Sequence, residues 1–81
     1  MRTANGRVDS FPERLRLLRE MQGWSQFDLA GQTGKYCSRR TIQNWESGFH
    51  SPRVSSPQLR SVAEVLRVDV PSLLFGKERK R

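Results

Sequence analysis

Apolar residues recur along the chain at three- and four-residue intervals, the spacing that places them on one face of a helix. Strict alternation of apolar and polar residues, which is typical of strands, does not extend over any useful length. The pattern predicts five short helices: over about residues 11–22, from about residue 26, over 39–46, from Pro57, and after Asp69. The predicted fold class is therefore all-α.

Residues able to accept a hydrogen bond from a first-turn N–H stand before each predicted helix. They are Ser10, Ser25, Ser38, Ser56 and Asp69. Ser10 with Glu13, and Ser25 with Asp28, have the spacing of a capping box, in which two residues satisfy each other's backbone N–H groups. Gly48 is the expected end of the third helix, because glycine readily adopts the left-handed conformation of a helix C-cap.

The chain has 81 residues, which is enough for one small domain that buries roughly 60% of its unfolded surface. The candidate core consists of Phe11, Leu15, Leu18, Trp24, Leu29, Ala30, Cys37, Ile42, Trp45, Leu59, Val62, Leu66, Val68 and Leu73. Trp24 and Trp45 are expected in this core rather than as platforms on which single-stranded bases stack. The apolar triplet 73–75 either closes the core or forms a dimer face. The predicted domain spans residues 10–76, between a mobile arm (1–9) and a basic tail (77–81).

Charge narrows the range of functions. The chain has 15 Lys and Arg against 8 Asp and Glu, a formal net charge of +7. Such a basic surface points to a polyanionic partner. Nucleic acid is the favoured class of partner, and an anionic membrane is the second. No apolar run approaches the roughly 20 residues of a membrane helix, and the first residues lack the apolar stretch of a signal peptide. The expected localisation is therefore cytoplasmic, with no membrane partner.

The sequence offers little for catalysis or for metal binding. Cys37 is the single cysteine and His50 the single histidine, so no disulfide framework and no multi-cysteine zinc site is expected. No plausible catalytic triad, phosphate loop or metal cluster is present, and we expect neither a cofactor nor an enzyme. Cys37 is interpreted as a core residue, with a redox switch as the alternative.

The third predicted helix has two chemically distinct faces. With Arg39 at zero on a helical wheel of about 100° per residue, Ile42 and Trp45 fall near 300° and 240°. The opposite face carries Arg39, Arg40, Gln43 and Asn44. Arginine can bond guanine O6 and N7, and asparagine or glutamine can pair with adenine N6 and N7. No acidic residue lies on this face, since Glu46 is at its border. Taken alone, such a helix is more often an ordinary solvated surface.

The context of this helix changes that interpretation. The segments 15–19 (LRLLR), 23–26 (GWSQ), 29–30 (LA) and 38–48 (SRRTIQNWESG) follow one another in order. Together they closely resemble the Cro and phage-repressor (XRE-type) helix-turn-helix, and residues 59–75 resemble that family's last two helices. The resemblance covers roughly residues 11–76. It implies a five-helix, lambda-repressor-like DNA-binding domain.

The resemblance also implies roles for individual residues. It assigns base contacts to Arg39, Arg40 and Asn44, with Gln43 as a further candidate. Gln26 matches the family's phosphate-binding glutamine at a helix N-terminus, and Ser38 begins the recognition helix. Lys35, His50 and Arg53, in the flanking turn and loop, are further candidates for phosphate contacts. Arg19 and Glu46 match the positions of an ion pair that joins the first and third helices.

The sequence departs from the family pattern at three places. The turn 34–37 is about two residues longer than the compact family turn, so the recognition helix could be displaced. The loop from Ser47 to Pro57 is longer by two or three residues. Thr33 stands where the family usually has a larger apolar residue.

The predicted function is sequence-specific binding of double-stranded DNA by a bacterial or phage-type, nucleoid-associated transcription regulator. Repression is favoured over activation. Helix 39–46 is expected to enter the major groove, and the protein is expected to bind a palindromic operator as a homodimer. The alternative is an antitoxin or adaptor module that uses the same fold mainly to bind a protein partner. A third possibility, an RNA or single-strand binder, would need exposed aromatic side chains.

Overall fold

The computed structural model describes residues 10–34 and 36–76. They form five helices: α1 (Phe11–Met21), α2 (Gln26–Gln32), α3 (Arg39–Ser47), α4 (Pro57–Leu66) and α5 (Val70–Phe75). No strand occurs in these ranges, and none of the five helices is long and apolar enough to cross a membrane. The predicted all-α class is confirmed. The predicted arm, Lys35 and the predicted tail lie outside the described residues.

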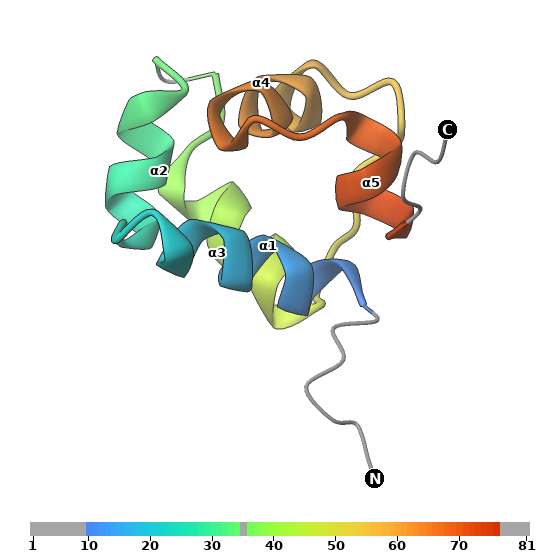
Figure 1. Ribbon diagram of the computed structural model, residues 1–81, viewed down its shortest axis with the longest axis horizontal. Coiled ribbons are helices and arrows are strands. Elements are labelled where there is room, and N and C mark those ends of the chain that lie inside the picture. The colour runs from blue at the N-terminus through green and yellow to red at the C-terminus, as the bar shows by residue number, and fades with distance from the viewer. Residues whose placement is uncertain (1–9, 35, 77–81) are drawn as a thin grey trace, which may run out of the picture.

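The five helices close around one core (Figure 1). Helix α1 packs against α3 and α5, α2 packs against α3 and α4, and α4 packs against α5. Each helix contributes a fully buried leucine or isoleucine: Leu15, Leu29, Ile42, Leu59 and Leu73. The core is thus shared by all the helices, and α3 is held by neighbours on two sides.

The predicted core agrees closely with the observed one. Every predicted member is either buried or packed against the buried cluster, and Ala63 joins it as a buried residue that the prediction omitted. Trp45 is buried and Trp24 is partly buried, as expected of core residues. The triplet 73–75 divides: Leu73 is fully buried, whereas Phe75 is exposed.

Serine caps begin four of the helices. The hydroxyls of Ser10, Ser25, Ser38 and Ser56 accept from the N–H groups of Glu13, Asp28, Thr41 and Leu59 at 3.4, 3.0, 3.2 and 3.2 Å. In α2 the capping box is complete, because Asp28 accepts from the Ser25 N–H at 2.9 Å. The prediction for Asp69 was wrong in detail. Its carboxylate makes no cap bond to the backbone and instead accepts from the Ser72 hydroxyl at 2.7 Å.

The long turn between α2 and α3 is closed by a buried hydroxyl. Thr33 is 5% exposed, and its Oγ1 donates to the Ala30 carbonyl at 2.7 Å and accepts from the Cys37 N–H at 3.2 Å. A larger apolar residue would fill the same space but could not satisfy these backbone groups. This is the physical reason for threonine at a position where an apolar residue was expected.

Cys37 is a packing residue. Its side chain is fully buried, and burial raises the pKa of the thiol to about 11. The thiol is therefore protonated at neutral pH, whereas the reactive form of cysteine is the thiolate. Of the two interpretations of Cys37, burial favours the core role over the redox switch.

Arg14 joins the first helix to the end of the last. Its Nε donates to the Leu73 carbonyl at 2.9 Å and its Nη2 to the Leu74 carbonyl at 2.8 Å. These carbonyls belong to the last turn of α5, whose orphan acceptors need partners. Gly76 follows with φ of +75°, and a Cβ there would lie 2.7 Å from Arg14 Nη1. The guanidinium therefore caps α5 in a space that only glycine leaves open.

We expect Arg14→Met to lower the free energy of unfolding by about 1–3 kcal/mol, the range for charged hydrogen bonds to partly buried acceptors. Urea denaturation followed by circular dichroism measures the change. Arg16→Met is the matched control, because Arg16 is an exposed residue of the same helix. Equal effects of the two substitutions would contradict the capping role of Arg14.

Candidate nucleic-acid interface

Helix α3 presents its apolar face inward and its polar face outward. Ile42 and Trp45 are buried. Arg39, Arg40 and Gln43 are exposed, and Asn44 is half-buried. The longer turn before α3 therefore leaves the apolar face of this helix in the core. The four predicted base-contacting side chains share one solvent-facing surface, as the helical wheel predicted.

The end of α3 is fixed by its own backbone. Gly48 has φ of +81°, and the Asn44 carbonyl accepts from the N–H groups of Phe49 and His50 at 3.0 and 3.4 Å. The His50 ring lies edge-on to the Phe49 ring, with 4.6 Å between centroids, and both residues are exposed. The loop that carries the predicted phosphate contacts thus leaves α3 in a defined direction.

A bidentate ion pair joins α1 to α3. Arg19 donates from Nε to Glu46 Oε2 at 2.7 Å and from Nη2 to Glu46 Oε1 at 2.9 Å. The two side chains are 11% and 5% exposed, so water screens them little. The hydrogen bond to Glu46 raises the pKa of Arg19 above its ordinary value, against the opposing effect of burial. The remaining guanidinium nitrogen of Arg19, Nη1, donates to the Trp24 carbonyl at 2.8 Å. This bond also fixes the turn before α2.

Gln26 enters the same network. Its Nε2 donates to Glu46 Oε1 at 3.1 Å, so the first residue of α2 is joined to α3 by a side-chain bond. One amide proton is used in this bond and the second remains for another acceptor. The family resemblance implied a phosphate contact for Gln26, and the sequence did not predict the bond to Glu46. A separation of 20 residues carries no local signal for such a bond.

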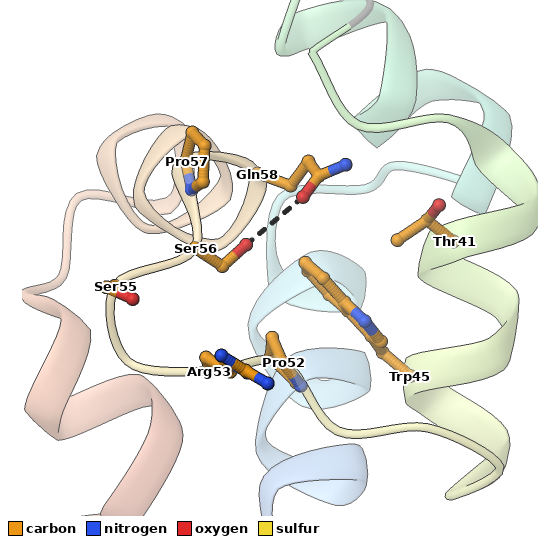
Figure 2. Close-up of a pocket in the computed structure, with 8 residues that line it drawn as sticks. All are labelled: Thr41, Trp45, Pro52, Arg53, Ser55, Ser56, Pro57 and Gln58. Atoms are coloured by element: carbon orange, nitrogen blue, oxygen red, sulfur yellow. Dashed lines mark hydrogen bonds between the residues drawn. The ribbon is translucent and has the colours of Figure 1, made fainter.

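A shallow pocket of about 390 Å³ lies between α3 and the start of α4 (Figure 2). Its lining consists of Thr41, Trp45, Pro52, Arg53, Ser55, Ser56, Pro57 and Gln58. Arg53 was predicted as a phosphate contact. The others were not assigned to any site from the sequence, because the α3–α4 loop brings them together only in the fold.

The exposed charged side chains of α3 are arginines. Arg39, Arg40 and Arg53 are exposed cations, and the nearest acid on α3, Glu46, is held by Arg19. The hydroxyl of Ser38 accepts from the Thr41 N–H and lies 3.1 Å from the Thr41 hydroxyl. Such a surface can attract a phosphate backbone and present donors to base edges.

The sequence matches the family described as "Helix-turn-helix domain" over residues 11–74. The chain belongs to this family. In this helix-turn-helix domain, α2 and α3 form the motif, and the turn between them contains the Thr33 closure. The resemblance to a helix-turn-helix family that the sequence indicated is thereby confirmed.

Two solved structures are similar to this helix-turn-helix domain. The solution structure of the DNA-binding domain of the P22 C2 repressor (residues 1–76) aligns with a TM-score of 0.70 and 24% identity, covering 86% of this chain and 87% of that one. An HTH_3 family transcriptional regulator from Vibrio cholerae aligns with a TM-score of 0.65 and 25% identity, covering 78% of this chain. The alignment covers 33% of the regulator, so the matching part is about a third of that protein. A comparison with curated proteins finds no match.

Proposed function

We propose that this helix-turn-helix domain binds double-stranded DNA sequence-specifically and acts as a transcriptional repressor. The observation that carries the proposal is the outward face of α3, where Arg39, Arg40 and Gln43 are exposed on a helix anchored by Ile42 and Trp45. A helix of this kind fits the major groove, whose base edges offer a distinct set of acceptors and donors for each base pair. The similarity to a repressor domain supports repression rather than activation.

The contacts divide into two kinds. Arg39, Arg40, Gln43 and Asn44 face the bases in this arrangement. Gln26, Ser38, His50 and Arg53, together with Lys35 outside the described residues, bind backbone phosphates on either side. Phosphate contacts set the register of the protein on the duplex, and base contacts supply the specificity. Binding blocks polymerase by occupying its site.

A homodimer on a palindromic operator is part of the proposal. One short helix contacts few base pairs, so two copies on half-sites about 34 Å apart are needed for specificity. The domain acts in the cytoplasm of a bacterial or phage-infected cell, where its DNA is found. The predicted arm 1–9 and basic tail 77–81 would add contacts to the same duplex.

We expect Arg40→Ala to cost about 1–3 kcal/mol on the preferred site and to relax base preference at one position. The reason is that a bidentate contact to guanine distinguishes it from the other bases. Selection of bound duplexes from a random library, followed by titration of the winner, measures both quantities.

Arg53→Ala is the matched control for this experiment. It also removes an exposed arginine, but one assigned to phosphate, so it should weaken all sequences alike and reduce the slope of affinity against salt by about one. If Arg40→Ala weakened every sequence equally, its base-reading role would be wrong. A steep salt dependence with no enriched sequence would overturn specific recognition altogether.

A further inference from the structure

The end of α2 is joined to the start of α3 by one side chain. Thr33 is the C-cap of α2, and its Oγ1 accepts from the Cys37 N–H at 3.2 Å while donating to the Ala30 carbonyl at 2.7 Å. Cys37 directly precedes Ser38, the N-cap of α3. A single hydroxyl therefore connects the last turn of α2 to the residue before the first turn of α3.

The hydrogen bonds that cross this turn in residues 10–34 and 36–76 all involve Thr33. Besides the bond from the Cys37 N–H, the Thr33 carbonyl accepts from the Tyr36 N–H at 3.4 Å, and the Cys37 carbonyl lies 3.4 Å from Thr33 Oγ1. Since Thr33 is 5% exposed and Cys37 is fully buried, water has little access to replace the hydroxyl. Its loss would leave the Cys37 N–H without an acceptor and loosen the link between the two helices.

Helix α3 is held at its two ends by different contacts. Glu46, in its last turn, is bound to Arg19 of α1, whereas the start of the helix depends on Thr33. Arg40 is an exposed residue of the first turn, and Asn44 lies one turn further along, closer to Glu46. Loss of the Thr33 hydroxyl would therefore displace the first turn of α3 while the last turn stays in place.

We propose that Thr33 is a positioning residue for DNA recognition, whose hydroxyl orients the first turn of α3 so that Arg40 reaches its base. This inference rests on the proposed function. A bidentate bond between a guanidinium and guanine requires a defined geometry, so a small displacement of the helix start weakens it. A hydroxyl can donate and accept at once, whereas an apolar side chain of similar size can only pack. Threonine thus gives a turn longer than the compact family turn the same control over the helix that follows.

The test uses the full chain and three single variants. Thr33→Val keeps the size of the side chain and removes the hydroxyl, whereas Thr33→Ser keeps the hydroxyl and removes the methyl group. Leu73→Val is the control for lost stability, because Leu73 is fully buried on α5, which packs against α1 and α4. Affinity for a duplex selected by the unaltered chain is titrated at a temperature where circular dichroism shows every variant to be folded.

We expect Thr33→Val to weaken binding about tenfold, the effect of one misplaced base contact, and to relax the base preference at the position that Arg40 contacts. Thr33→Ser and Leu73→Val should bind as the unaltered chain does. An equal loss in Leu73→Val would show that affinity follows stability and would overturn the positioning role. Unchanged affinity in Thr33→Val would overturn this role alone, whereas failure of the unaltered chain to select any duplex would overturn the proposed function as well.

Double-mutant cycles locate the effect along α3. Arg40→Ala removes the contact that Thr33 is proposed to position, so adding Thr33→Val should cause little further loss of affinity. Asn44→Ala removes a contact near the Glu46 end of the helix, and there the two losses should add. A hydroxyl that only stabilises the fold would give additive losses in both cycles, and that result would contradict the proposal.

Hydrogen exchange of the unaltered protein tests the bond itself, without any substitution and without DNA. We expect the Cys37 amide to exchange as slowly as that of Ile42, whose N–H donates to the Ser38 carbonyl at 3.1 Å. Rapid exchange at Cys37 with Ile42 still protected would overturn the role of Thr33. Because this measurement does not depend on whether the chain binds DNA, it separates failure of this proposal from failure of the proposed function.

Discussion

Trp45→Ala is expected to lower the free energy of unfolding by about 3–5 kcal/mol, the range for truncating a buried aromatic residue. The indole ring packs edge-on against Phe11, with 5.9 Å between ring centroids and 61° between the ring planes. Truncation would leave a cavity between α1 and α3, and a domain of this size has few other buried side chains to offset the loss. Since small domains are stable by only about 5–15 kcal/mol, this loss removes a large share of the total. Thermal unfolding and urea titration followed by circular dichroism measure it.

The control for this prediction is Phe27→Ala. Phe27 is 72% exposed on α2, so its truncation also removes an aromatic ring but creates no cavity. We expect a change within about 0.5 kcal/mol, as for most exposed positions. A cooperative unfolding transition that Trp45→Ala leaves in place would show that Trp45 does not hold α1 and α3 together.

The helices and the core could be predicted from the sequence because their signals are local. The serines before α1 to α4 and the glycine after α3 are recognised one turn at a time, and the spacing of apolar residues within each helix already defines its buried face. The outward face of α3 follows from the same periodicity. A helical wheel alone places the arginine and amide side chains on one face of α3 and Ile42 with Trp45 on the other, so no tertiary information is needed.

The network around this helix could not be predicted in the same way. Arg19 and Glu46 were paired only through a family resemblance, and the amide bond from Gln26 to Glu46 had no signal in the sequence. The capping of α5 by Arg14 spans about 60 residues. Side chains that reach across the fold depend on how helices pack, and apolar spacing determines which faces are buried but not which polar atoms meet.

Arg19→Met is expected to lower the free energy of unfolding by about 3–5 kcal/mol, the cost of leaving one charge of a buried pair without its partner. The Glu46 side chain is 5% exposed and would retain only the Gln26 amide among its described partners. The Trp24 carbonyl would lose its donor as well. Arg16→Met, on the exposed side of α1, should have little effect. Since its pKa is raised, the native Arg19 stays charged at every pH below that value, so the deficit of the variant should persist across the neutral range.

The double variant Arg19→Met/Glu46→Met separates stability from positioning. Removing both charges together eliminates the unpaired carboxylate, so we expect most of the lost stability to return, as it does when buried pairs are replaced by apolar residues of similar volume. Gln26 would no longer be joined to α3, however, and its amide would be free to rotate. If the pair orients the two helices for DNA, the double variant should fold but bind its preferred duplex more weakly, with the deficit present at every sequence. Recovery of both stability and affinity would show that the pair is a feature of packing alone. Recovery of stability without affinity would support a role for Glu46 in positioning Gln26 for the proposed phosphate contact.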